Sequence, residues 1–174
     1  MVENTHVIIA VGAASLTTMI VVGIFFRHKL KHLQKYGYLG IFLLCLIGNI
    51  AIFSPAAPMV TLISGRYYKP WLVGLTAALG AVLGEVLAYN VGAVGQLAIK
   101  DKPWFETVHQ YIEKNGFLTI LLVTAVPNPV LNFASAAAGA LHYPLWKSLI
   151  ASFLGNWLQY FITASLGLLT KKII

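Results

Sequence analysis

Glu85 is the one ionisable side chain that lies deep in a long apolar segment, residues 71–99, of this 174-residue chain. A carboxylate in the hydrocarbon of a membrane is costly, so such a group is neutral, paired, or in contact with a wet cavity. One interpretation is that Glu85 binds a proton or contacts a substrate headgroup. The other is that it is a protonated carboxyl group hydrogen-bonded to another helix, and the sequence leaves both open.

Neutral polar side chains accompany Glu85 at helical spacing. Tyr89 follows one turn later on the same helix face, and a second apolar segment, residues 146–169, contributes Asn156, Gln159 and Tyr160. Together these residues predict a polar strip through the centre of the molecule, a pathway for a substrate or a proton. The alternative is that the neutral ones only hydrogen-bond between helices, at about 0.6 kcal/mol each.

Proline-containing sequences interrupt two further apolar segments, residues 38–64 and 117–141. Proline lacks an amide donor and clashes with the preceding turn, and each flank of the first break, ~22 Å as a helix, is shorter than the ~30 Å hydrocarbon core. We expect two re-entrant hairpins, each of two half-helices; one kinked spanning helix is the alternative. The predicted turn residues are Ser54, Pro55, Pro58, Pro127, Asn128, Pro129 and Asn132.

These turns are a second candidate site. The half-helix after each turn begins with free amide groups and the positive end of a helix dipole, which attract a phosphate group without any arginine. Asn132 equally serves as a cap of its half-helix.

The composition excludes a soluble protein. Hydrophobic residues make up 59% of the chain and charged residues 10%, whereas soluble domains contain about 45–50% and about 25%. The net charge of +7 comes from basic residues beside apolar segments, which favours anionic lipids over nucleic acid as partners. With one cysteine, Cys45, and no catalytic triad or phosphate-binding loop, we expect no disulfide, metal site, cofactor or enzymatic activity.

The N-terminal region predicts one additional spanning helix. Residues 7–26 are apolar and long enough, about 30 Å, to cross a membrane. A basic connector follows, so we expect the N-terminus outside and both the connector and the C-terminus in the cytoplasm, in a prokaryotic cytoplasmic membrane. Four residues of the connector are predicted to contact lipid headgroups: Arg27, Lys29, Lys31 and Lys35.

Three further helices complete the predicted elements. Residues 71–99 form a spanning helix with small residues at every fourth position, which lets another backbone approach closely. Residues 146–169 form the last spanning helix, and Pro103 starts an interfacial helix before residue 117. The small residues are Thr76, Gly80, Gly84, Ala88 and Gly92.

The second half of the chain repeats the first. Gly84-Glu85 with Tyr89 returns as Gly155-Asn156 with Tyr160, and both halves carry a proline break followed by Gly and Pro. The predicted fold is an all-α integral membrane protein: an N-terminal span, then an inverted repeat of re-entrant hairpin plus spanning helix. The single membrane domain, residues 1–174, divides into a span at 7–26, repeat 1 at 27–99 and repeat 2 at 100–172.

Several short motifs resemble the VTT domain of the DedA superfamily, also called SNARE-associated Golgi proteins. They are Val126-Pro127, Leu131-Asn132, Ala138-Gly139, Pro144 and Leu154-Gly155, with Gly80, Gly84, Tyr89 and Gly92 in the first half. The resemblance implies two re-entrant hairpins that face each other across the bilayer. It also implies a role in moving lipids, as a phospholipid scramblase or a flippase for lipid carriers.

The chain departs from the family pattern at charged positions. DedA proteins usually carry an acidic residue after the first proline turn and arginines around the second, whereas residues 57–59 and 124–130 are uncharged here. Those charges are associated with proton-coupled transport and with binding a phosphate. The resemblance therefore implies lipid movement without carrying over either mechanism.

We expect the protein to facilitate the movement of lipids across the bilayer. A proton-linked transporter of small solutes or drugs that uses Glu85 is the second hypothesis. A non-transporting scaffold, which recruits partners through the basic connector, is the third. Membrane lipids are the expected partners, nucleic acid is not, and the sequence leaves a homo-oligomer open.

Overall fold

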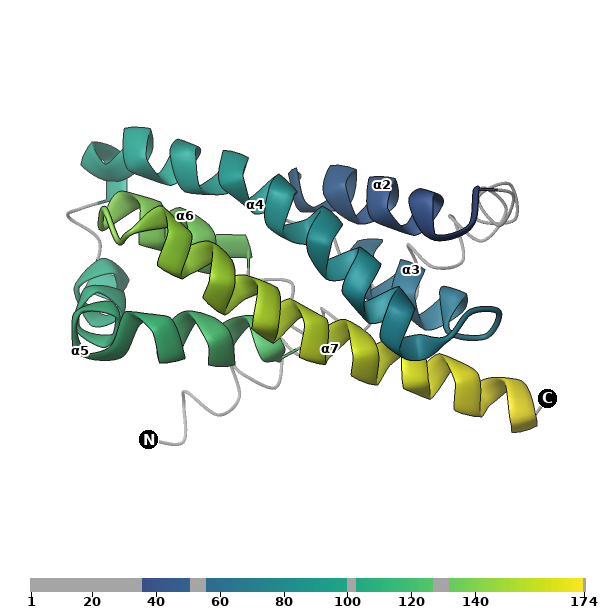
Figure 1. Ribbon diagram of the computed structural model, residues 1–174. Coiled ribbons are helices and arrows are strands. Elements are labelled where there is room, and N and C mark those ends of the chain that lie inside the picture. Colours follow the sequence, from purple (N-terminus) through teal and green to yellow (C-terminus); the bar gives the residue numbers. More distant parts are fainter. Residues whose placement is uncertain (1–35, 51–55, 100–102, 127–131, 174) are drawn as a thin grey trace.

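The computed structural model describes residues 36–50, 56–99, 103–126 and 132–173, and within these ranges the chain consists of helices and short turns with no strand. The predicted all-α class is confirmed for this part of the chain (Figure 1). The helices are α2 (Gly37–Ile50), α3 (Ala56–Ser64), α4 (Pro70–Ile99), α5 (Pro103–Ala125), α6 (Asn132–Ala140) and α7 (Leu145–Ile173).

Proline and turn residues set several helix boundaries. Pro70 and Pro103 are the first residues of α4 and α5, where a missing amide hydrogen costs nothing and φ is already helical. The end of α6 is closed by His142, whose φ of 52° lies in the left-handed region. Tyr143 N–H then donates to the Ala138 carbonyl at 2.9 Å, the hydrogen bond that closes a helix C-terminus in a Schellman motif.

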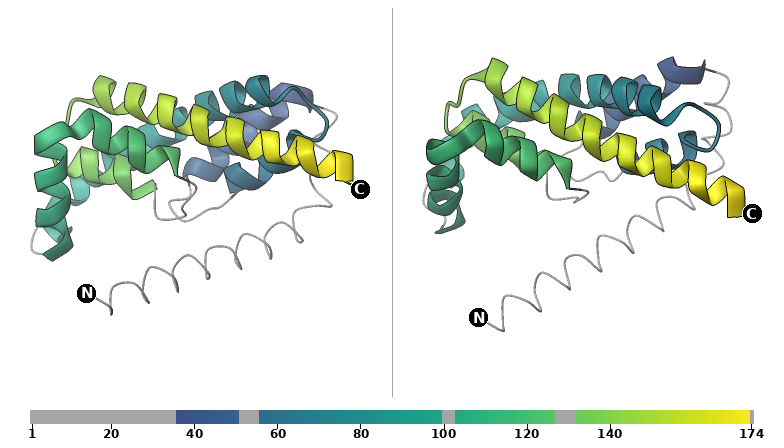
Figure 2. Two further views of the ribbon diagram at one scale, coloured as in Figure 1. Left: turned by 90° about the horizontal axis from the view of Figure 1, so that it is seen from below. Right: turned by 60° about the horizontal axis from the view of Figure 1, so that its bottom comes forward.

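The two long helices organise the fold. α4 and α7 pack against each other and run in opposite directions (Figures 1 and 2). α2 packs on α4, and α5 packs on α7. Each of the two nine-residue helices packs on the long helix of the other half of the chain. α3 lies mainly against α7, and α6 lies mainly against α4. Each long helix is therefore covered by a short helix from the other half of the chain.

α5 is bent rather than straight. Asn115 has φ −158° and ψ 63°, which are not helical values, and the two arms of α5 diverge there. The Thr119 hydroxyl donates to the Tyr111 carbonyl across the bend at 3.1 Å. The bend lies within two residues of the predicted boundary between an interfacial helix and the apolar segment that begins at residue 117.

Small residues bring the helix backbones into contact. A Cβ added at Gly80 would collide with the Phe42 carbonyl of α2, and one added at Gly92 would collide with the Ala136 carbonyl of α6. Gly139 of α6 lies equally close to the Tyr89 carbonyl. The predicted small-residue stripe on α4 therefore contacts two helices in succession, α2 first and then α6.

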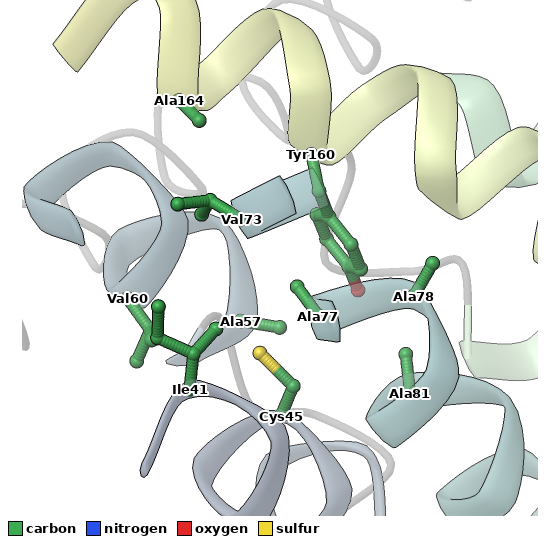
Figure 3. Packing of buried hydrophobic residues seen from close by; sticks show 10 residues of the cluster. All are labelled: Ile41, Cys45, Ala57, Val60, Val73, Ala77, Ala78, Ala81, Tyr160 and Ala164. Atoms are coloured by element: carbon green, nitrogen blue, oxygen red, sulfur yellow. The ribbon is translucent and has the colours of Figure 1, made fainter. Parts of the chain in front are cut away.

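The largest apolar cluster joins α2, α3, α4 and α7 (Figure 3). Its side chains are mostly small, so the helices come close while few large groups fill the space between them. Cys45 is fully buried in it, as the interpretation of that residue as a small hydrophobic group requires. The buried members are Ile41, Cys45, Ala57, Val60, Val73, Ala77, Ala78, Ala81, Tyr160 and Ala164.

Apolar side chains also cover the outside of α4. Leu79, Leu83, Leu87 and Val91 are exposed at four-residue spacing, the pattern expected where one helix face contacts lipid. Within the described ranges, α4 is the one helix that is long and apolar enough to cross a membrane, over Pro70–Gly95. α7 has 29 residues but is less apolar than α4, so its membrane span stays a prediction.

The close approach of α6 to α4 predicts that alanine substitution at two glycines of α4 changes the stability of the protein by different amounts. Gly92→Ala should lower the stability by about 1–3 kcal/mol, because the new methyl group meets the Ala136 backbone. Gly95→Ala is the matched control, since nothing lies within 4 Å of its added Cβ, and it should be neutral or stabilising by up to about 1 kcal/mol. Thermal unfolding of both variants in detergent measures the difference; equal midpoints would contradict the close contact.

Candidate functional site

The Glu85 carboxyl group lies where α4, α6 and α7 meet. Its side chain is 3% exposed. Asn156 Nδ2, on α7, donates a hydrogen bond to Glu85 Oε1 at 2.7 Å, and Ser135 Oγ, on α6, donates to Oε2 at 2.9 Å. Both carboxyl oxygens therefore have a partner, and each partner comes from a different helix of the second half of the chain.

Glycines beside Glu85 and Asn156 explain how the site is sealed. Gly84 packs against the backbone of α2 at Leu46, and Gly155 packs against α5 at the Leu121 carbonyl. Since neither position carries a side chain, α2 and α5 approach α4 and α7 at the level of the carboxyl group. Glu85 and Asn156 are both buried as a result.

The partners of the Glu85 carboxyl group are neutral. In residues 36–50, 56–99, 103–126 and 132–173, the structure shows one ion pair, His109 with Glu113 at 3.3 Å, on a partly exposed face of α5. Glu85 makes no such pair with a described residue. An amide and a hydroxyl that donate to its oxygens are the arrangement that stabilises a negative charge, yet no described cation balances it.

Ser152 lies beside the carboxyl group without completing a hydrogen bond. It is fully buried on α7, one turn before Asn156 and next to Glu85. Its Oγ has no hydrogen-bond partner among the described residues. A buried hydroxyl group without a hydrogen-bond partner lowers the stability of the folded protein. The site therefore contains one polar group that its hydrogen bonds leave unsatisfied.

Polar side chains continue along the inner face of α7. They follow at three- and four-residue spacing over ~22 Å of helix, about three quarters of the ~30 Å hydrocarbon core. At the far end, the Thr163 hydroxyl lies 2.9 Å from that of Thr61 on α3. We call this set the α7 polar row, and its members, all buried, are Ser148, Ser152, Asn156, Gln159 and Thr163.

The predicted site residues are brought together in part. Asn156 bonds to Glu85, and Gln159 is buried in the α7 polar row. Tyr160 is buried in the apolar cluster, near Asn49 and on the side of α7 that faces Glu85. Tyr89 does not bond to Glu85. Its hydroxyl donates to the Tyr143 carbonyl at 2.6 Å and so links α4 to the turn between α6 and α7.

Sequence reasoning did not single out Ser135 or Ser152. Ser152 was detectable, because Ser148, Ser152 and Asn156 repeat every four residues on one helix. Ser135 had no comparable signal, since its role depends on how α6 lies across α4.

Several predicted residues lie outside the described ranges. Of the turns, Pro58 lies in the first turn of α3, and Asn132 is the first residue of α6, the end of a helix at which asparagine caps are found. The remaining turn residues, the span at 7–26 and the basic connector are not described, so their roles stay predictions. These residues are Ser54, Pro55, Pro127, Asn128, Pro129, Arg27, Lys29, Lys31 and Lys35.

Comparison with known proteins gives one family and two relatives. The family model described as the VTT domain matches residues 54–169. An uncharacterized protein of Methanocaldococcus jannaschii is 26% identical over 148 residues, which cover 82% of this chain and 91% of that protein. Vacuole membrane protein KMS2 of Arabidopsis thaliana is 24% identical over 127 residues, 60% of this chain but only 29% of the plant protein. No solved structure matches.

The hydrogen bond between Asn156 and Glu85 predicts a contrast between two asparagines. Asn156→Ala should cost about 1–3 kcal/mol, because it leaves a buried carboxyl oxygen without its donor. Asn90→Ala is the control, since Asn90 is exposed and bonds only to the Val86 carbonyl of its own helix; its effect should stay within about 0.5 kcal/mol. Unfolding midpoints in detergent compare the two, and an equal loss would argue against a structural Glu85–Asn156 bond.

Proposed function

The chain belongs to the VTT domain family and is a membrane protein of the DedA type, and on this premise we propose that it facilitates the movement of lipids between the two leaflets of a membrane. The observation that carries the proposal is the α7 polar row with Glu85 at its centre. A polar headgroup crosses hydrocarbon at a high free-energy cost because nothing there replaces its hydrogen bonds to water. A row of hydroxyl and amide groups through the bilayer replaces part of them.

The proposal requires the α7 polar row to become accessible, because its members are buried in this conformation. The covers that can move are the short helices α3 and α6, each of nine residues. α3 lies over Thr163 through Thr61, and α6 lies over Glu85 through Ser135. Each short helix is held there by one interhelical hydroxyl hydrogen bond and by apolar contacts, which a local displacement separates.

We further propose that α2 with α3, and α5 with α6, are two re-entrant hairpins of an inverted repeat. With 14 and 9 residues, α2 and α3 extend ~21 Å and ~14 Å, and neither alone crosses ~30 Å of hydrocarbon. The open ends of each hairpin lie together: the Tyr38 and Tyr68 ring centroids are 5.1 Å apart, and Gly116 adjoins the Tyr143 ring.

Contacts in equivalent positions add support for the repeat. Gly65, directly after α3, packs against Ala164 of α7, and Gly139 of α6 packs against α4 between Tyr89 and Ala93. Glu85 and Asn156, which correspond in the two halves, bond to each other. Residues on a two-fold axis meet their own counterparts in this way, and inverted repeats place substrate sites at such an interface.

Labelling of introduced cysteines tests this topology. In a Cys45→Ala background, Tyr36→Cys and Tyr67→Cys should react with a membrane-impermeant thiol reagent from the same side of intact cells, since both exposed positions flank one hairpin. Tyr111→Cys and Trp146→Cys should react from the opposite side. Labelling of Tyr36→Cys and Tyr67→Cys from different sides would mean that the first segment spans the membrane.

Lipid movement is tested with vesicles that contain the full-length protein and a headgroup-labelled phospholipid or polyprenyl phosphate. A quencher added outside should reach the inner-leaflet label faster than in empty vesicles. Gln159→Leu and Thr163→Val should slow the quenching of the inner-leaflet label several-fold. Each removes a hydrogen bond to the passing headgroup, and the loss of about 1 kcal/mol raises the barrier to lipid movement by that amount.

Thr76→Val is the matched control for Thr163→Val, because the Thr76 hydroxyl bonds only to carbonyls of its own helix. Its rate should equal that of the unmodified protein. No acceleration over empty vesicles for any tested lipid would reject the proposal.

The second candidate is a proton-linked transporter of small solutes or drugs, and the neutral surroundings of Glu85 favour it. A buried carboxyl group without an ion pair among the described residues is the arrangement in which proton uptake removes a costly charge. Glu85→Gln should then abolish pH-dependent uptake into vesicles. Uptake that keeps its pH dependence in this variant would eliminate the candidate.

A further inference from the structure

We propose that Glu85, Ser135, Ser152 and Asn156 form a binding site for a small monovalent cation, Na⁺. The site lies where α4, α6 and α7 meet, and its four side chains are all buried. Cation binding here does not depend on lipid movement, and it is measured at equilibrium without a membrane.

Charge is the first argument. Glu85 is 3% exposed, so burial opposes its ionised form, whereas the hydrogen bonds from Ser135 and Asn156 at 2.9 and 2.7 Å favour that form. An ionised carboxylate that is buried with neutral partners leaves one uncompensated negative charge, which is strongly destabilising. A single positive charge in the site removes this cost, whereas a divalent ion would replace it with an excess positive charge.

The helices around the site supply no such charge from the described residues. α3 and α6 contain no ionisable side chain, and α2 contains Tyr38 and Cys45. α7 brings Tyr160 near Glu85, while its lysines, at 147, 171 and 172, belong to its two ends. Since no described residue of these helices supplies the positive charge, we assign it to a bound cation, and the test below separates that cation from a proton.

Ser152 is the second argument, because it is a polar group without a partner. Its Oγ is fully buried next to the Glu85 carboxyl group, yet it completes no hydrogen bond of good geometry with a described residue. A hydroxyl oxygen that is kept in a buried site at this cost becomes satisfied when it coordinates a cation. The Ser135 hydroxyl contacts the same carboxyl group, at 2.9 Å from Oε2.

The ligand chemistry selects the class of ion. Carboxylate, hydroxyl and amide oxygens are hard ligands that suit alkali and alkaline-earth cations, whereas thiolate and imidazole ligands suit transition metals. Asn156 keeps its hydrogen bond to Glu85 Oε1 and orients the carboxylate, so the coordinating oxygens come from Glu85, Ser135 and Ser152. In membrane transporters, such ion sites lie near the ends of interrupted helices at mid-depth, and Ser135 is in the first turn of α6.

Thermal unfolding of the purified full-length protein in detergent tests the site, with a thiol-reactive dye that reports the exposure of buried Cys45. Na⁺ is titrated against choline at constant pH and ionic strength. The midpoint should begin to rise near the dissociation constant and then increase with the logarithm of the Na⁺ concentration, by roughly 5–10 °C at 100 times that constant. Ser152→Ala should raise the Na⁺ concentration at which the rise begins about tenfold, and Glu85→Gln should remove the response.

Ser165→Ala is the matched control, since Ser165 lies on the same helix outside the α7 polar row and its hydroxyl donates to the Phe161 carbonyl; this variant should keep the response of the unmodified protein. Ser152→Ala decides the outcome if Glu85→Gln does not fold, because it removes a hydroxyl that bonds to no described residue. A midpoint that is indifferent to Na⁺, or that responds equally in Ser152→Ala, overturns the proposal. A midpoint that follows pH and not Na⁺ also overturns it and identifies the proton as the ligand, while lipid movement is judged separately in the vesicle assay.

Discussion

The burial of one carboxyl group constrains the rest of the fold. Glu85 lies in the middle of an apolar helix and has to receive its hydrogen bonds from protein. Ser135 and Asn156 supply them only while α6 and α7 lie against α4. Glycine next to Glu85 and next to Asn156 lets α2 and α5 close over the same level. Five of the six described helices thus meet around a group that no single helix satisfies.

The short helices are the adaptable part of this arrangement. α4 and α7 pack against each other, whereas α3 and α6 each pack mainly on the long helix of the other half of the chain. Their hydroxyl groups, on Thr61 and Ser135, reach the polar face between the long helices at two separate levels. A displacement of either helix would open one level of the polar face and leave the contact between the long helices in place.

Local features of the chain were predictable because local rules decide them. Proline at helix starts, the small-residue spacing of α4, the boundary near which α5 bends and the polar positions Glu85 and Asn156 all follow from residue type and spacing. The hydrogen-bond partners were less predictable, since they depend on crossing geometry. Tyr89 shares a helix face with Glu85, but its longer side chain reaches the Tyr143 carbonyl instead. The contact of Ser135 with Glu85 depends on how α6 crosses α4, which residue type and spacing do not determine.

The pairing of Glu85 with Asn156 has a consequence for how such a chain arises. If the two halves descend from one duplicated unit that assembled as a dimer, both positions once held the same residue, and that residue faced its own copy. Two carboxylates in that place would repel each other, and two amides would carry no charge. In that case, fusion into one chain lets the two copies differ, so that one position holds the acid and the other holds its hydrogen-bond donor. A single chain with two halves can place different residues at the two equivalent positions, whereas a dimer of identical chains cannot.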